Sequence, residues 1–420
     1  MINLNERDRE LERTSLSIFS NWPRTKIIFG NKMIIDTGKY ALKFGNNALV
    51  VIGGGSIKQN KILDKLIDSL NRYKIKYDIY EGVEPNPSKE TVHSIAEKYN
   101  SSSYDVAIGL GGGSVLDATK AALILTTAKE KDISKFFGVD KVSEKIKRIS
   151  PCICIPTTAG TSSEISRYAN ITVKELSVKK LISDIAIHPH FAIVDPELTI
   201  SCSKDLTITV GLDSLTHSME GYLNTVQDEG NNDINERALI SIEIIFKWLK
   251  VAAEQPNNLE ARKMMSIACL LGGTIIGGER FKGTGGPHMN SFSWAETIPH
   301  GKATGIMLPY YIIYYAKNPK VKEKLIQISK ILKIKVYDTE NIGKIIAEYI
   351  LNWYKSLGFP TSLKELTGWK EDYIEKALKD AKENEMKLKA MPNPVPLEKV
   401  NELLRPILEA ARDGNLDLIK

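Results

Sequence analysis

The sequence has few cysteines and no pattern that would make them metal ligands or crosslinks. Its 420 residues contain four of them, Cys152, Cys154, Cys202 and Cys269, and none forms a CxxC pair. This spacing argues against a disulfide framework and against a thiolate-rich zinc module. We expect four small, buried, apolar side chains in a protein of a reducing compartment.

Long apolar runs and clustered charge are also absent. No apolar stretch reaches the roughly 18 residues of a membrane span, and the first thirty residues are too charged for a signal peptide. The formal net charge is +6, but 57 Lys and Arg are interspersed with 51 acidic residues and form no basic tail. We therefore expect a cytoplasmic protein with neither a membrane nor a nucleic acid as its partner.

The sequence does contain a regular alternation of short β-rich runs with helical patterns over its first half. Examples are "NALVVIG" at 47–53 and "DVAIGLG" at 105–111, each followed by a helical pattern. Alternation of this kind predicts a mostly parallel sheet. From Asp205 onward nearly every segment has the spacing of an amphipathic helix. We predict an α/β dinucleotide-binding domain over 1–200 and an all-helical domain over 201–420.

A glycine-rich turn follows the second of these strands. In "GLGGGSVLDATK" the strand continues into Gly111, Gly112 and Gly113, and a helix is expected to begin at Ser114. Glycines let the backbone approach a ligand closely, and a helix N-terminus attracts a pyrophosphate. The spacing nearly matches the dinucleotide fingerprint. The same turn is also compatible with a purely structural role.

A similar turn, "GGGSIK" at 53–58, follows the first strand. Many dinucleotide-binding proteins have an acid here, for the ribose 2′-hydroxyl. This chain instead has Gly54, Ser56 and the cation Lys58. The absence of an acid favours NADP over NAD, although NAD stays possible, and the turn is equally compatible with a simple tight turn.

A third segment, "CIPTTAGTSSEIS" at 154–166, is rich in hydroxyl groups and follows an apolar strand. Its hydroxyl and backbone donors could surround a nucleotide. It could equally begin a helix, with Ser or Thr as the N-cap followed in sequence by Glu164.

The strongest local signal lies in "GLDSLTHSMEGYL". Asp213 and His217 are four residues apart and therefore share one face of a helix, although this spacing is also common in surface and capping pairs. His288 and His300 stand in one stretch, "GPHMNSFSWAETIPHG". If these two histidines meet the first pair, one oxygen and three imidazoles surround a first-row divalent metal. His93, His188 and His190 are interpreted as structural or solvent-facing.

Taken together, these motifs resemble those of the iron-containing, group III alcohol dehydrogenases. The resemblance extends over almost the whole chain and depends on the joint order of "GVEPNP", "GLGGGSVLDATKAA", "PTTAGTSSE", "AIVDPELT", "GLDSLTHSMEGYL" and "PHG" before "MLP". The "GGGSIK" turn is similar to that of the butanol dehydrogenase and aldehyde reductase branch, in which NADP is common. The architecture that the family shares with dehydroquinate synthase is an α/β dinucleotide domain followed by a helical domain.

The resemblance implies a homodimeric, metal-dependent oxidoreductase that transfers a hydride between NAD(P)(H) and a small alcohol or aldehyde. It implies Fe²⁺, with Zn²⁺ possible, on the ligands Asp213, His217, His288 and His300. The coenzyme residues that it implies are Asn86, Gly111, Gly112, Gly113, Ser114, Asp117, Thr157, Thr158, Thr161 and Lys179, beside Gly54 and Ser56 of the first turn.

Two features depart from the family pattern. His288 and His300 are 12 residues apart, where most members have 14, so the loop between them must be tighter. Phe292 stands where many members have a further histidine, so a proton-relay role for that position is not carried over. Phe292 and Trp294 either line an apolar substrate pocket or belong to the core. The alternatives are a lyase like dehydroquinate synthase, for which Lys282 and Lys302 alone supply nearby cations, and a non-catalytic nucleotide-binding relative.

Overall fold

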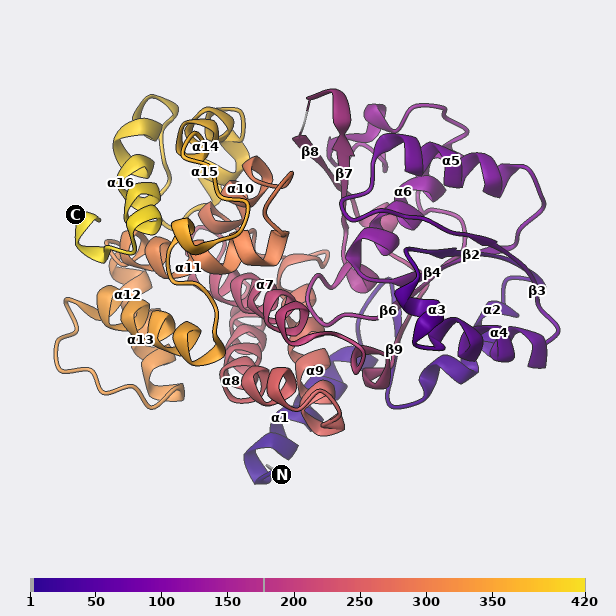
Figure 1. The fold of residues 1–420 in the computed structure, drawn as a ribbon, viewed down its shortest axis with the longest axis horizontal. Helices are drawn as coiled ribbons and strands as arrows, with labels where there is room; N and C mark the ends of the chain where they lie inside the picture. Colours follow the sequence, from indigo (N-terminus) through magenta and orange to yellow (C-terminus); the bar gives the residue numbers. More distant parts are fainter. Residues whose placement is uncertain (1–3, 177, 420) are drawn as a thin grey trace. The chain divides into compact units, whose positions relative to one another are not determined.

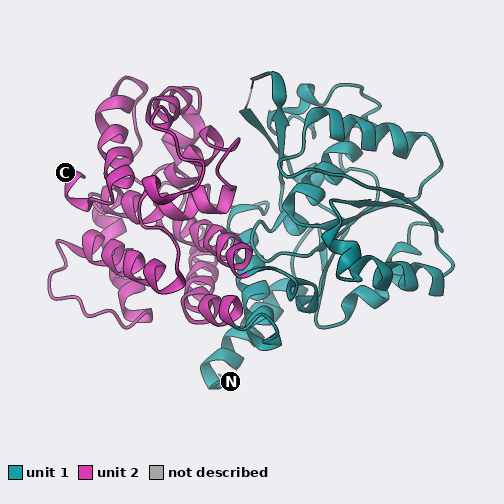
Figure 2. Cartoon of the chain, in the orientation of Figure 1, with its two compact units in different colours: residues 1–203, 255–279 teal, residues 204–254, 280–420 magenta. Residues whose placement is uncertain are grey.

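The computed structural model describes residues 4–176 and 178–419, and these form two compact units. Unit 1 comprises residues 1–203 and 255–279, and unit 2 comprises residues 204–254 and 280–420 (Figure 2). The division differs from the one expected at residue 200, because α9 (Leu259–Ile276) belongs to unit 1. Gly273 of α9 approaches the loop before η3 (Ser163–Ile165), where an added Cβ would lie 2.4 Å from Cβ of Ser162.

Unit 1 is built on a parallel sheet with helices on both faces, as the strand-helix alternation predicts (Figure 1). Among the described residues its six strands have the order β1 (Lys26–Phe29), β9 (Phe191–Val194), β6 (Cys152–Pro156), β4 (Val106–Gly111), β2 (Asn47–Ile52) and β3 (Lys76–Tyr80). Every neighbouring pair in this sheet is parallel. The carboxyl ends of all these strands therefore lie at one edge of the sheet.

The two faces of the sheet belong to two separate apolar cores, so the strands are apolar at consecutive positions. Leu49, Val51 and Cys154 contribute to one core, and Val50 and Ile155 contribute to the other. All four cysteines are buried and none is in a disulfide, as the sequence predicts. The helices that cover the sheet are α2 (Thr37–Ala41), α3 (Ser56–Gln59), α4 (Ile62–Arg72), α5 (Lys89–Asn100) and α6 (Gly113–Ala128).

Unit 1 also contains a small sheet that the sequence analysis did not predict. Its strands are β5 (Gly138–Val139), β8 (Val178–Ser183) and β7 (Tyr168–Val173), with β7 and β8 antiparallel. The helix α1 (Glu6–Ser20) begins with a capping box, in which the Asp8 N–H donates to Asn5 Oδ1 and the Asn5 N–H donates to Asp8 Oδ2.

Unit 2 is helical, as predicted. It contains α7 (Lys204–Leu223), α8 (Asn232–Glu254), α10 (Gly286–Ser293), α11 (His300–Tyr315), α12 (Pro319–Ile331), α13 (Ile342–Leu357), α14 (Tyr373–Lys382), α15 (Glu385–Ala390) and α16 (Val400–Asp413). The central α7 is buried along almost its whole length. Among the described residues, no helix is both long and apolar enough to cross a bilayer.

Glycines allow α7 to approach its neighbours closely. A Cβ on Gly211 would lie 2.4 Å from Cδ1 of Leu249 in α8, and a Cβ on Gly301 would lie 2.2 Å from the carbonyl oxygen of Thr209. Real Cβ atoms do not approach other atoms this closely, so the first turn of α11 can rest on α7 only because residue 301 is glycine. This contact brings His300, the first residue of α11, close to Asp213.

Candidate functional site

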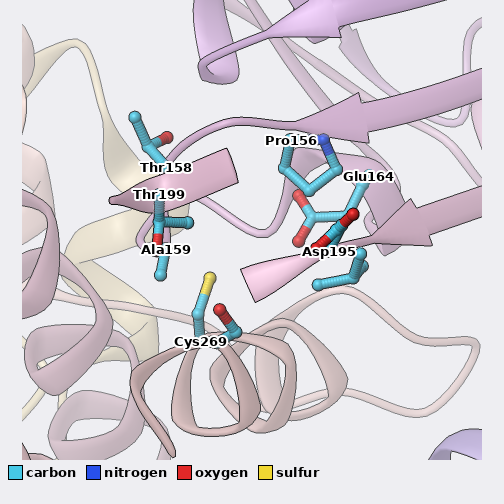
Figure 3. Close-up of a pocket in the computed structure, with 9 residues that line it drawn as sticks. Pro156, Thr158, Ala159, Glu164, Asp195, Thr199 and Cys269 are labelled. Carbon is cyan, nitrogen blue, oxygen red and sulfur yellow. The ribbon is translucent and has the colours of Figure 1, made fainter. Parts of the chain in front are cut away.

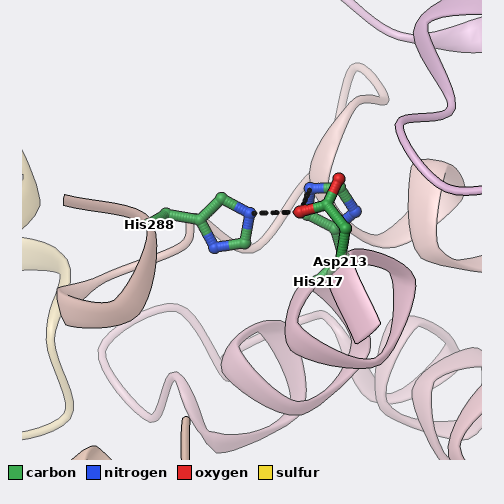
Figure 4. Close-up of side chains that lie close together, drawn as sticks. All are labelled: Asp213, His217 and His288. Carbon is green, nitrogen blue, oxygen red and sulfur yellow. Dashed lines mark ion pairs between the residues drawn. The ribbon is translucent and has the colours of Figure 1, made fainter. Parts of the chain in front are cut away.

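The four proposed metal ligands lie together within unit 2, although they come from three helices. Helix α7 carries Asp213 and His217, α10 carries His288, and α11 begins at His300. Nε2 of His217, His288 and His300 lies 3.9, 3.6 and 3.5 Å, respectively, from Oδ1 of Asp213. Figure 4 shows Asp213 and His217 on one helix with His288 pointing toward them. Three imidazole nitrogens thus surround one carboxylate oxygen.

The donor set fits a divalent first-row metal. Asp213, His217 and His288 can each offer one ligand atom, and these atoms lie within 4.8 Å of one another. Ligands bound tetrahedrally at about 2.1 Å from one ion lie roughly 3.4 Å apart, close to the 3.5 to 3.9 Å that separate each imidazole Nε2 from Oδ1 of Asp213. Nε2 of His288 is buried and has no hydrogen-bond partner among the described residues. A buried polar atom without a partner is costly, and a metal would supply that partner.

Glu220 is part of this cluster and was missed by the sequence analysis. Its carboxylate accepts short hydrogen bonds from Nδ1 of His288 and, at 2.7 Å, from the Gly285 N–H. The side chain is buried, and burial raises the pKa of Glu220 while the charge of Lys387 opposes the increase. The bond at Nδ1 directs Nε2 of His288 toward Asp213, an orientation that a metal ligand requires. The signal was present, because residues 213, 217 and 220 share one helical face.

Burial also affects the protonation of the ligands. It lowers the pKa of His288 well below its usual 6.5, and the charge of Lys387 acts in the same direction. A neutral imidazole is the form that binds a metal. Thr304 donates to Oδ1 of Asp213 at 3.2 Å, which further fixes this carboxylate.

The short spacing between His288 and His300 is accommodated by a compact turn. Helix α10 ends at Ser293 and α11 begins at His300. Between them the N–H groups of Thr297 and Ile298 both donate to the Trp294 carbonyl. Trp294 is a core residue, fully buried, with its indole N–H donating to the Tyr373 carbonyl. Phe292 is half-buried, and its ring centroid lies 6.3 Å from that of His300.

In unit 1, three of the predicted coenzyme segments come together around the N-terminus of α6. Gly112 caps the helix, and α6 begins at Gly113. The Thr157 N–H donates to the Gly111 carbonyl at 3.0 Å, and the Asn86 N–H donates to the Ser114 hydroxyl at 3.1 Å. A Cβ on Gly113 would lie 2.6 Å from Oγ1 of Thr161, and one on Gly112 would contact Oγ1 of Thr158 at 3.6 Å. Hydroxyl side chains and a helix N-terminus therefore meet at the carboxyl ends of β4 and β6, a suitable place for an anion.

Asp117 has protein partners on both carboxylate oxygens. Ser163 Oγ donates to Oδ1 at 2.5 Å, and the Asn170 N–H donates to Oδ2 at 2.9 Å. Burial raises the pKa of Asp117, while the charges of Lys120 and Lys179 lower it. These bonds link α6 to the segments after β6, so Asp117 orders the loop; a coenzyme contact stays a prediction, as it does for Lys179.

The segment after β6 does not begin a long helix, which was one of its two interpretations. It passes through Ser162, which has a left-handed φ of 54°, into the short 3-10 turn η3. A small pocket lies beneath it, lined by Pro156, Thr158, Ala159, Glu164, Val194, Asp195, Thr199, Ser266 and Cys269 (Figure 3). Burial raises the pKa of Glu164 to about 7.

The turn after β2 exposes Gly54 and Ser56, but its cation already has a protein partner. Nζ of Lys58 lies 2.5 Å from Oε2 of Glu81, which directly follows β3. The remaining histidines lie outside the metal cluster. His93 Nε2 accepts from the Ile133 N–H, His190 Nδ1 accepts from the Cys152 N–H, and His188 is buried.

Comparison with known proteins agrees with this fold. Residues 23–196 match the family description "Iron-containing alcohol dehydrogenase", and residues 207–408 match "Fe-containing alcohol dehydrogenase family, C-terminal". The chain is 32% identical over 324 residues to an NADPH-dependent butanol dehydrogenase of Clostridium saccharobutylicum, covering 76% of this chain and 80% of that protein. It is 28% identical to the NADH-dependent butanol dehydrogenase A of Clostridium acetobutylicum, covering 91% of this chain and 97% of that protein.

The chain is also similar in fold to solved structures of alcohol oxidoreductases. An iron-containing alcohol dehydrogenase of Thermotoga maritima superposes with a TM-score of 0.76 at 31% identity, over 92% of this chain and 98% of that one. A 1,3-propanediol oxidoreductase superposes with a TM-score of 0.80 at 27% identity, over 92% of this chain and 97% of that one. The chain therefore belongs to the iron-containing alcohol dehydrogenase family and is an alcohol/aldehyde oxidoreductase.

Proposed function

We propose that this enzyme transfers a hydride between NAD(P)(H) and a small aliphatic alcohol or aldehyde, and that the reaction depends on a divalent metal held by Asp213, His217, His288 and His300. The observation that carries the proposal is the convergence of three imidazole Nε2 atoms on Oδ1 of Asp213, at 3.5 to 3.9 Å. Fe²⁺ is the proposed metal, and Zn²⁺ accepts the same ligands. A metal bound there supplies Lewis acidity to a substrate oxygen.

The proposed coenzyme site lies at the carboxyl ends of β4 and β6 in unit 1. The N-terminus of α6 binds the pyrophosphate with Gly111, Gly112, Gly113 and Ser114. The proposal assigns further coenzyme contacts to Asn86, Asp117, Thr157, Thr158, Thr161, Lys179, Gly54 and Ser56. NADP is the coenzyme favoured by the "GGGSIK" turn, with NAD as the other.

In alcohol oxidation the carbinol carbon loses a hydride to the nicotinamide ring, and the hydroxyl group loses a proton; aldehyde reduction reverses both steps. Phe292 is half-buried beside His300 and has no group that accepts a proton. The proton therefore leaves through water or coenzyme hydroxyls. The apolar ring of Phe292 favours a short aliphatic substrate over a charged one.

The charges around the metal cluster disfavour the lyase alternative, which needs free cations for a phosphorylated and carboxylated substrate. Lys302 pairs with Asp205 at 2.7 Å, and Lys282 pairs with Asp228 at 2.6 Å. Lys387 donates to the Thr284 hydroxyl. Each of these three lysines thus has a protein partner.

A cytoplasmic homodimer completes the proposal. It rests on the family resemblance alone. Size-exclusion chromatography with light scattering tests the dimer, since a mass near the 46.8 kDa of one chain contradicts it.

The substrate class is tested with Fe²⁺-loaded enzyme, by following oxidation of NADPH and of NADH with butanal and with succinic semialdehyde. The proposal expects kcat/KM for butanal to exceed that for the carboxylated aldehyde by about tenfold or more, a difference of about 1.4 kcal/mol. If an enzyme that binds metal and nucleotide oxidises neither coenzyme with any short aldehyde, the assignment of hydride transfer to these substrates fails.

A further inference from the structure

The turn that carries Gly54 and Ser56 lies beside the end of a second strand. Strands β2 and β3 are parallel, with Val51 opposite Tyr80, so both chains leave the sheet at the same edge. The Gly82 N–H donates to the Gly53 carbonyl at 3.3 Å, which holds the two exits together. Glu81 therefore stands next to the turn in space, although it is far from the turn in sequence.

Glu81 changes the electrostatics that the turn alone would have. Its Oε2 lies 2.5 Å from Nζ of Lys58, and each side chain of the pair is 46% exposed. The carboxylate neutralises the one cation that the turn offers to a 2′-phosphate. It also adds a negative charge, which repels a phosphate dianion and can accept a hydrogen bond from a ribose 2′-hydroxyl.

We propose that Glu81 is a specificity-determining residue for the coenzyme, and that it acts against the NADP preference of the "GGGSIK" turn. Bound NADP(H) takes Lys58 away from Glu81 and places its 2′-phosphate against the ammonium group. Bound NAD(H) leaves the pair intact and donates its 2′-hydroxyl to the Glu81 carboxylate. The enzyme consequently binds both coenzymes, with affinities within about tenfold of each other. This inference rests on the proposed function, because it needs the adenosine ribose at this turn.

The competing explanation is an ordinary surface ion pair, which stabilises a protein very little. In that case the pair contributes nothing to coenzyme choice, and its removal alters neither coenzyme affinity. The two explanations therefore make different predictions for one measurement.

The measurement is the Kd of NADPH and of NADH, from coenzyme fluorescence, for the full-length protein without substrate. Glu81→Gln should lower the Kd of NADPH by about tenfold, because it removes the repulsion and frees Lys58, and should raise the Kd of NADH about threefold. Lys58→Gln should raise the Kd of NADPH by about tenfold and leave that of NADH within about twofold.

Glu130→Gln is the matched control. Glu130 forms a comparable pair with Lys135 at 2.6 Å in the same unit, so its loss changes the net charge equally. It follows the C-terminal end of α6, a helix about 24 Å long whose N-terminus is at the glycine turn. Both Kd values should match the wild type.

An unchanged ratio of the two Kd values in Glu81→Gln, to within twofold, overturns the role of Glu81 while the proposed function stands. If the wild-type protein binds neither coenzyme, the proposed function fails and this inference fails with it. Since Lys58 and Glu81 are both half exposed, the variants should fold normally, and circular dichroism checks this.

Discussion

At the scale of single residues, Glu220 is a buried side chain in direct contact with His288 of the candidate metal cluster. It accepts from Nδ1 of His288 and from the Gly285 N–H, so it fixes both the ring and the start of the helix that carries it. Outer-shell partners of this kind typically contribute 10- to 100-fold to metal affinity. We therefore predict that Glu220 positions His288 for metal binding.

We predict that Glu220→Gln raises the Kd of Zn²⁺ by roughly 10- to 100-fold, because His288 and the Gly285 N–H use different carboxylate oxygens and the amide keeps only one acceptor oxygen. Competition against a chromophoric chelator measures this Kd without any turnover. Glu236→Gln, the same substitution on an exposed position of α8, is the control and should bind like the wild type. A Kd for Glu220→Gln within twofold of the wild type would exclude the positioning role.

The buried His188 should make the free energy of unfolding depend on pH, independently of catalysis. Burial, helped by the charges of Lys120 and Arg167, lowers the pKa of His188 to about 3. The native state keeps this ring neutral, whereas the unfolded chain takes up a proton near pH 6.5. The unfolded state therefore binds more protons between pH 6.5 and about 3, and stability falls as the pH drops through this window.

The expected loss from His188 alone is about 2 kcal/mol between pH 7 and pH 5. Urea unfolding of the wild type and of His188→Leu at both pH values measures it. Glu164, with its pKa raised to about 7, acts in the opposite direction, but it is present in both proteins. Equal pH dependence in the two proteins would contradict the assignment.

The types and spacing of Asp213, His217, His288 and His300 allowed the sequence to predict that they lie together, as they do, whereas metal binding by them stays a prediction. Glu220 could have been included, since it follows His217 by three residues on the same helix. The Lys58–Glu81 pair could not have been foreseen, because it depends on which strand lies beside β2. The sequence of the turn indicated that Lys58 is free. In the structure β3 lies beside β2, which brings Glu81 next to Lys58.

At the scale of helices, the contact of α11 with α7 determines where His300 lies. Gly301→Ala would place a Cβ 2.2 Å from the Thr209 carbonyl and 3.2 Å from Cβ of Asp213, so the helix must shift. We expect about 1–3 kcal/mol of destabilisation from overpacking, together with a roughly tenfold weaker metal affinity. Thermal unfolding and metal titration measure the two effects.

Gly305→Ala in the same helix provides the comparison. Its Cβ would lie 3.0 Å from Cβ of Leu212, a milder clash that is one turn farther from His300. It should cost less stability and leave metal affinity within about threefold of the wild type. A larger loss of metal affinity in Gly305→Ala than in Gly301→Ala would contradict this account of the helix contact.

The regular elements of unit 1 were predictable, and its irregular ones were not. The predicted strands at 47–53 and 105–111 correspond to β2 (Asn47–Ile52) and β4 (Val106–Gly111). The helical pattern after β2 divides into α3 and α4 at Lys61, whose φ is 56°. Helical periodicity does not reveal such a left-handed break at a lysine.

At the scale of the whole molecule, the two units are not continuous in sequence. Residues 255–279, which include α9, belong to unit 1 although residues 204–254 before them belong to unit 2. Amphipathic spacing identifies α9 as a helix but carries no information about which unit it packs against. Two glycines of this segment allow it to pack against unit 1, since Gly273 and Gly277 approach Ser162 and Ser166 closely. Close packing of this kind is a tertiary property, so a boundary based on sequence periodicity places α9 in the helical half.

Metal binding should also stabilise the protein measurably. All four ligands belong to unit 2, so metal at about 100 times its Kd should add roughly 2.7 kcal/mol to that unit and raise its Tm by several degrees. Differential scanning calorimetry of chelator-treated protein, before and after addition of Zn²⁺, measures this shift. His217→Ala should show little shift, and an equal shift in both proteins would place the metal elsewhere.

Metal-dependent hydride transfer is tested by restoring metal to the stripped enzyme. Chelator-stripped enzyme is assayed for NADPH and NADH oxidation with butanal, before and after anaerobic addition of Fe²⁺ or Zn²⁺, beside His300→Ala. We predict negligible activity without metal, recovery with at least one of the two ions, and loss of that recovery in His300→Ala. Full activity in the stripped enzyme, or equal recovery in His300→Ala, would contradict this prediction.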